Sequence, residues 1–268
     1  REMNLSETVF VLPPEDPAAL RALRIFTPGK ELPMAGHPVV GTWFMLAQRG
    51  IVPPPVGGNG LVTIFQQIKL GTLPVDVEFA DGLPNCVWMT QGKPVVGDPL
   101  DLAKECAAAL RLDVEETGGW QLPIVVASTG VPYLIVPIKN RTALSRIRPD
   151  SQAITALCDR FSLDAIYAVS PESHSKEALV SARMFGNENI GLTEDPATGS
   201  AAGPLAAALV HFGFAGSGNG TVAFIIEQGV DMGRASRIQA EVSVSDGVLE
   251  KVRIGGSAVE VLTGTMPL

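Results

Sequence analysis

Two short glycine-rich loops, far apart in the chain, each lead into a run of small apolar residues. The first loop spans residues 35–42 (AGHPVVGT) and the second spans residues 194–203 (EDPATGSAAG). Each run is typical of a helix that is buried on all sides. Each loop would place backbone N–H groups at a helix N-terminus, where unpaired donors and the helix dipole favour an anion. The pattern predicts two buried helices whose N-terminal ends face each other and clamp a small carboxylate.

The first half of the chain reads as strands around one helix. Runs at 6–12 and 20–27 flank a Pro-Pro-Glu-Asp-Pro turn and predict a hairpin. A helix is expected over 39–47, with His37 at its cap and Pro38 in its first turn. Further strands are expected at 61–65, 68–73, 75–79 and 86–90.

After residues 91–99, which read as a Gly- and Pro-containing linker, the same plan repeats. Helices are expected at 100–110, 151–161 and 200–212. Strands are expected at 124–128, 133–138, 165–170, 222–227, 236–244 and 248–255. The last apolar segment, 258–262, is expected to return to the first half.

This order of strands and helices predicts an α+β protein of two similar domains, each a mixed or antiparallel sheet wrapped around its one apolar helix. The expected N-terminal domain is residues 1–92 joined by 256–268, and the C-terminal domain is 93–255. A doubly wound nucleotide-binding sheet is disfavoured, because neither loop matches Gly-x-Gly-x-x-Gly or a P-loop. A nucleotide-dependent dehydrogenase is therefore a weak alternative.

Composition excludes several classes of partner. A net charge of -8 without any basic cluster argues against nucleic acid. The apolar runs are far shorter than the roughly 20 residues that span a bilayer, so no membrane partner is expected. No secretory leader is recognised. The three cysteines, an odd number without metal-like spacing, indicate neither a disulfide framework nor a zinc site, and they fit a reducing cytoplasm.

Five segments together resemble one enzyme family, in its order and over nearly the whole chain. They are residues 1–8 (REMNLSET), 24–28 (RIFTP), 31–38 (ELPMAGHP), 194–201 (EDPATGSA) and 227–234 (EQGVDMGR). These segments are similar to those of the PhzF-like family, phenazine-biosynthesis-type isomerases of the diaminopimelate epimerase superfamily. The resemblance is specific for the family and not for the substrate.

The resemblance implies two similar domains of the diaminopimelate epimerase-like fold, an active site in the cleft between them, a homodimer, and no cofactor or metal. Carried over by motif, the family's catalytic residues fall on Glu7, His37 and Asp195. Its contacts to substrate polar groups fall on Gly36, Gly199 and Ser200.

The sequence differs from the family pattern at two positions. Met34 stands where an aromatic residue is common, and Ala235 where a proline is common. The resemblance also implies that the family's first strand, its Gly-Asn-Pro loop and most of its first helix precede Arg1.

A proton moved between two carbons needs a group that both accepts and donates it. Glu7 is the candidate, because on a strand it would share a face with Leu5 and Val9, and burial raises a carboxyl pKa. Asp195, just before a helix start, is expected to stay ionised. His37 would donate a hydrogen bond or carry a second proton, and Ser200 would orient the substrate. A two-thiol mechanism is disfavoured, because none of the cysteines lies in either glycine loop.

These features predict an isomerase that needs no cofactor and acts on a small carboxylate by general acid–base catalysis. Two alternatives stay open. One is an epimerase or racemase of the same superfamily, and the other is a non-catalytic binding or scaffold protein that keeps the fold.

Overall fold

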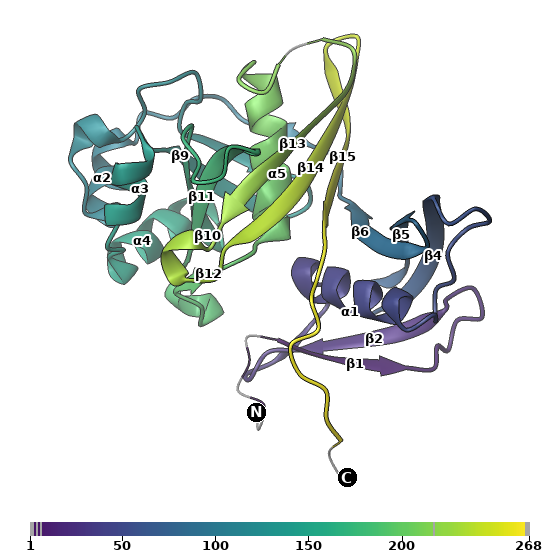
Figure 1. The fold of residues 1–268 in the computed structure, drawn as a ribbon. Helices are drawn as coiled ribbons and strands as arrows, with labels where there is room; N and C mark the ends of the chain where they lie inside the picture. The colour runs from purple at the N-terminus through teal and green to yellow at the C-terminus, as the bar shows by residue number, and fades with distance from the viewer. Residues whose placement is uncertain (1–2, 4, 6, 217, 266–268) are drawn as a thin grey trace. The chain divides into compact units, whose positions relative to one another are not determined.

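The computed structural model describes residues 3, 5, 7–216 and 218–265. It is a mixed α/β fold rich in strands, with few helices (Figure 1). The chain divides into two compact units, the first comprising residues 1–90 and 255–268 and the second residues 91–254. The expected domain limits at 92/93 and 255/256 stay a prediction.

The first unit is a sheet with one helix against it. Its strand order is β1-β2-β4-β5-β6, with β3 paired to β2. β2 and β4 are parallel, whereas the other neighbours are antiparallel. The elements are β1 (Thr8–Leu12), β2 (Arg21–Phe26), β3 (Glu31–Leu32), α1 (Gly36–Gln48), β4 (Gly60–Ile68), β5 (Gly71–Ala80) and β6 (Leu83–Thr90).

Helix α1 packs on this sheet through residues spaced four apart. Val39, Trp43 and Ala47 lie on one stripe of the helix and are buried in the unit's core. The Trp43 indole Nε1 donates to Oε1 of Gln66 on β4 at 2.7 Å, which satisfies the one polar atom of a fully buried side chain. The stripe fixes the face that α1 turns to the sheet. Ala258, from the C-terminal segment, also packs against this core.

The second unit is a larger mixed sheet with helices on both faces. Its strand order is β15-β14-β13-β11-β10-β9-β8-β7, with β12 paired to β11. The strands are β7 (Val95–Val96), β8 (Val125–Ser128), β9 (Pro132–Pro137), β10 (Ala165–Ser170), β11 (Ala178–Gly186), β12 (Glu194–Asp195), β13 (Gly220–Gln228), β14 (Ser236–Ser245) and β15 (Val248–Gly256). The helices are α2 (Ala103–Leu110), α3 (Arg141–Arg146), α4 (Ser151–Phe161) and α5 (Gly199–His211).

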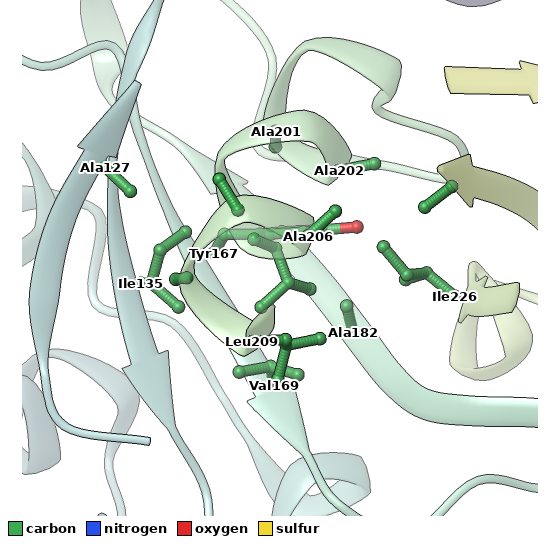
Figure 2. Packing of buried hydrophobic residues seen from close by; sticks show 14 of the residues in the cluster. Ala127, Ile135, Tyr167, Val169, Ala182, Ala201, Ala202, Ala206, Leu209 and Ile226 are labelled. Carbon is green, nitrogen blue, oxygen red and sulfur yellow. The ribbon is translucent and has the colours of Figure 1, made fainter. Parts of the chain in front are cut away.

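The period-2 alternation of the strands builds two cores on this sheet. On β10, Ala165, Tyr167 and Val169 face the core that holds α5, whereas Ile166 and Ala168 face the core formed with α2 and α4. Figure 2 shows α5 enclosed by side chains from several strands. Every residue from 201 to 210 is buried, which confirms the expectation of a central helix without a solvent face.

Most expected elements are present. The β1–β2 hairpin is confirmed, with Thr8 opposite Phe26, although Ser6 lies outside the described residues. Helix α4 and strand β10 have the expected limits, 151–161 and 165–170.

Other expectations were wrong in detail. The expected strand 68–73 does not exist, because Ile68 pairs with Gly71 across the turn of the β4–β5 hairpin and Pro74 continues β5. The expected linker 91–99 contains β7, which pairs with β8. The helix expected from Leu100 begins at Ala103.

The sequence interpretation also missed β11 and α3. β11 is buried along nearly its whole length and lacks the polar alternation that marks a half-exposed strand. α3 has six residues, too few for a helical period to show. Among the described residues, every helix is too short or too polar to span a bilayer.

Candidate active site

The first glycine loop forms the start of α1. The N-cap residue of α1 is Ala35, and His37 is the second residue of the helix. The prediction that His37 caps the helix is therefore wrong. Pro38 lies in the first turn, where its missing N–H has no helical partner to lose. Ala35 contributes no side-chain capping hydrogen bond, which leaves the leading N–H groups of α1 to other acceptors.

Glu7 and His37 meet at this helix end. Oε2 of Glu7 lies 3.0 Å from Nε2 of His37. The Glu7 side chain is 13% exposed and the His37 side chain 38%, so the carboxylate is the more enclosed partner. A carboxylate and an imidazole within hydrogen-bond distance can hold or pass a proton.

Glu7 is covered less by its own strand than the sequence suggested. It directly precedes β1 instead of lying within it. Val9 packs against the core of the first unit, whereas Leu5 is 55% exposed. Glu7 is therefore enclosed through its position beside α1 and not by apolar residues on both sides in sequence.

The second loop joins β12 to α5. Asp195 ends β12, pairs with Met184 of β11, and is 5% exposed. It lies three residues before Thr198, the N-cap of α5, so it does not occupy the helix start directly. The Thr198 hydroxyl donates to Oδ2 of Asp195 at 2.5 Å.

Gly199 and Ser200 are the first two residues of α5. The Gly199 carbonyl accepts from Nε2 of Gln91 at 3.0 Å. The Ser200 hydroxyl lies 2.7 Å from the phenol oxygen of Tyr133 on β9. Burial, partly offset by the Ser200 hydrogen bond, raises the pKa of Tyr133 to about 12, so this phenol keeps its proton at neutral pH.

The structure thus gathers the expected residues into two groups, each within one unit. Glu7, Gly36 and His37 lie at the start of α1, and Asp195, Gly199 and Ser200 lie around the start of α5.

Sequence reasoning missed residues that bond to these groups. The sequence did not point to Tyr133 as a site residue, because an aromatic residue is ordinary within an apolar strand such as β9. Thr198 and Gln228 lie inside two of the motifs, and their side chains bond to the Asp195 turn. Only the motif membership pointed to them.

The cysteines are free and buried. Burial, with a smaller contribution from Glu105, raises the pKa of Cys106 to about 12. Burial also raises the pKa of Cys158 to about 12. These two thiols stay protonated at neutral pH and are poor nucleophiles.

Among the described residues, no three or more His, Cys, Asp or Glu side chains gather in a group that could hold a metal ion.

The chain is similar along its length to proteins of known sequence and structure. An uncharacterized isomerase of Mesorhizobium japonicum is 38% identical over 274 residues, which cover 99% of this chain and 86% of that protein. A trans-2,3-dihydro-3-hydroxyanthranilate isomerase of Pseudomonas aeruginosa is 36% identical, over 97% of this chain and 81% of that protein. The crystal structure of a Bacillus anthracis phenazine biosynthesis protein of the PhzF family matches with a TM-score of 0.83 at 27% identity, covering 96% of this chain and 83% of that chain.

These relatives define the chain as an isomerase. The sequence model of the phenazine biosynthesis-like family, PhzC-PhzF, matches residues 1–264, and the chain belongs to this family.

Proposed function

We propose that this isomerase moves a proton between two carbons of a small carboxylate by general acid–base catalysis, without a cofactor. The observation that carries the proposal is the Glu7–His37 pair, with 3.0 Å between Oε2 and Nε2 and a carboxylate only 13% exposed. A partly enclosed carboxyl group can accept and release a proton more readily near neutral pH than a fully solvated one.

The name of a relative supports the proposed substrate class. One homologue, 36% identical, is named for trans-2,3-dihydro-3-hydroxyanthranilate. Such a compound carries a carboxylate and an amino group on a partly unsaturated ring. In the proposed step the carboxylate of Glu7 takes a proton from a ring carbon, and the electron pair of the broken C–H bond shifts along the adjacent double bonds. A new C–H bond forms at another carbon when a proton returns, so no oxidant or reductant is needed.

We further propose that the two units are the two domains of the fold and that the substrate lies in a cleft between them. The N-termini of α1 and α5 would hold its carboxylate through N–H groups of Gly36, Gly199 and neighbouring residues. The absence of a side-chain cap at Ala35 and at Thr198, both in the described part of the chain, supports this role.

The remaining side chains position the substrate or assist the proton transfer in this proposal. His37 donates a hydrogen bond to the substrate or carries a second proton, and Ser200 orients the substrate through its hydroxyl. Asp195 contacts the substrate and positions it while Glu7 exchanges the proton, a division of labour that acid–base sites use. We also propose a homodimer in the cytoplasm, where free cysteines are the rule.

The test is turnover of trans-2,3-dihydro-3-hydroxyanthranilate in D2O, followed by proton NMR. The proposal expects a shifted double bond with deuterium at the carbon that gains the proton. Glu7→Gln should lower kcat by about 10² to 10⁴, the range of one general acid–base group. Glu31→Gln is the matched control, because Glu31 is a half-buried carboxylate of the same unit that pairs with Arg24.

The same experiment separates the alternatives. Full turnover by Glu7→Gln would refute the role of Glu7. Deuterium at a stereocentre without movement of the double bond would favour an epimerase or racemase. Binding without any exchange would favour a non-catalytic member of the fold.

A further inference from the structure

Residues 227–234 contain a motif that the proposed chemistry does not use. Its second residue, Gln228, is the last residue of β13 and is 1% exposed. Because side chains alternate along a strand, Glu227 and Gln228 point to opposite faces of the sheet. Glu227 bonds to backbone N–H groups of His174 and Ser175, whereas Gln228 bonds to the turn that carries Asp195.

All the bonding positions of the Gln228 amide are filled. Nε2 donates to the Asp195 carbonyl at 2.6 Å and to the Thr198 hydroxyl at 2.9 Å. Oε1 accepts from the Tyr167 phenol at 2.7 Å and from the Thr198 backbone N–H at 3.1 Å. Rotating the amide by 180° would oppose donors to donors and acceptors to acceptors, so its orientation is fixed.

This fixed amide determines where the Thr198 hydroxyl points. Because that oxygen already accepts from Nε2 of Gln228, its own proton is directed to Oδ2 of Asp195. A chain of hydrogen bonds therefore runs from the Tyr167 phenol through Gln228 and Thr198 to the Asp195 carboxylate.

The first member of the chain acts as a donor to Gln228. Tyr167 is fully buried on β10, and burial, with smaller effects of Asp195 and Tyr133, raises its pKa well above the usual range. Its phenol proton is therefore retained and is available to Oε1 of Gln228.

The residue after Gln228 brings the backbone against the same turn. Gly229 has φ +78°, and a Cβ there would lie 2.7 Å from the Pro196 carbonyl oxygen and 2.3 Å from that of Arg234. Only glycine fits this close approach. The Gln-Gly pair thus contacts both Asp195 and the residue that follows it.

We infer that Gln228 is a positioning residue, which orients the Asp195 carboxylate by fixing the Thr198 hydroxyl. Arg183 supports the arrangement from β11, since its guanidinium bonds both carboxylate oxygens of Glu194 at 2.8 and 2.9 Å. The backbone on either side of Asp195 is therefore held, and the hydroxyl of Thr198 sets the remaining freedom, which is the direction of the carboxylate. This inference rests on the proposed function, in which Asp195 contacts the substrate.

The experiment measures kcat and KM of Gln228→Leu, Thr198→Val, Thr198→Ser and the Gln228→Leu/Thr198→Val double variant with trans-2,3-dihydro-3-hydroxyanthranilate. Each disruptive single variant should lose about 10² in kcat, the scale of a 1 Å misplacement. Thr198→Ser keeps the hydroxyl and should stay within about fivefold of the wild type. Because both single changes break one chain, the double variant should lose little more than either single variant.

Two conservative variants keep the test decisive if Gln228→Leu does not fold. Tyr167→Phe removes only the first donor and should lower kcat about fivefold, the scale of one neutral hydrogen bond. Ser181→Ala is the matched control, because Ser181 donates a buried hydroxyl to Glu227, the preceding residue of the same strand. It should lower thermal stability while kcat stays unchanged.

The outcomes separate this inference from the proposed function. Single variants within twofold of the wild type, or additive losses in the double variant, would overturn the positioning role of Gln228. If the wild type does not turn over the compound, the proposed substrate fails, and crystal structures of the wild type, Tyr167→Phe and Thr198→Val decide the inference. An Asp195 carboxylate that keeps its direction in both variants would overturn it.

Discussion

Oε2 of Glu7 and Nε2 of His37 lie 3.0 Å apart, although the two residues are 30 positions apart in the chain. The contact arises because Glu7, the residue before β1, lies beside the first turn of α1. Residues close in sequence do not produce this contact, since Leu5 is exposed and Ala35 is the N-cap residue of α1. The pair supplies the first prediction.

Replacing His37 should separate its two candidate roles. His37→Phe should lower kcat by about 10², since it removes both hydrogen bonding and proton transfer. His37→Gln keeps a hydrogen-bond donor and should recover most of the loss only if donation is the task. Steady-state kinetics give the answer, and the melting temperature should change little, because a partly exposed pair contributes at most about 1 kcal/mol. A wild-type kcat in His37→Phe would show that His37 has no role in catalysis.

A glycine on α5 should resist alanine, whereas its counterpart on α1 should accept it. A Cβ on Gly203 would lie 2.2 Å from Oε1 of Gln91, whose amide is held by Gly199 and Thr129. Gly203→Ala should therefore destabilise the fold by about 1–3 kcal/mol through overpacking.

The matched control for that change is Gly41→Ala, where no atom lies within 4 Å of the added Cβ. It should stabilise the protein by about 0.5–1 kcal/mol, because alanine is the better helix former. Urea unfolding of both variants measures the difference. Equal effects would show that Gln91 gives way.

Glu227 should make the fold sensitive to acid. Burial acts to raise its pKa, but hydrogen bonds from Ser181, His174 and Ser175 outweigh that effect and lower the pKa below 4.5. A group with a lowered native pKa contributes stability above its unfolded pKa and loses it as the pH falls through the native value.

Glu227→Gln should therefore lower stability at pH 7 and flatten the decline that the wild type shows below about pH 4.5. Denaturant unfolding between pH 7 and pH 3 tests this, with Glu250→Gln as the control, because Glu250 is an exposed carboxylate of the same unit. Parallel stability curves for the wild type and Glu227→Gln would contradict it.

Tyr133 should matter for binding and for alkaline stability. Its pKa of about 12, raised first by burial, means that the phenol stays protonated and in contact with Ser200 through neutral pH. Tyr133→Phe should raise KM about fivefold with little change in kcat, if Ser200 orients bound substrate.

The same raised pKa gives the sign of the alkaline effect. The stability contributed by the protonated phenol is present below about pH 10 and is lost as the pH rises toward 12. Tyr133→Phe should lose stability less steeply across that interval, as measured by urea unfolding. An unchanged slope would indicate that Tyr133 ionises as easily in the folded protein as in the unfolded one.

Much of the secondary structure could be predicted from the local sequence. The apolar run after Gly199 predicted α5, and the limits of α4 and β10 could be predicted to the residue from caps and period. β11 could not, because a strand buried on both faces shows no alternation, and Arg183 interrupts its apolar pattern. The turn before β5 was also missed, because the apolar residues from Ile68 to Leu73 resemble one continuous strand.

The sequence by itself determined the family, the strand-rich mixed architecture and the two helices that follow glycine loops, because these depend on residue periods, breakers and motif order within short windows. Only the tertiary structure decided which side chains bond to which: Glu7 to His37, Tyr133 to Ser200, and Gln228 to Asp195 and Thr198. A hydrogen bond needs its two atoms within about 3 Å and correctly oriented. That condition is set by how strands and helices pack, which no local pattern encodes.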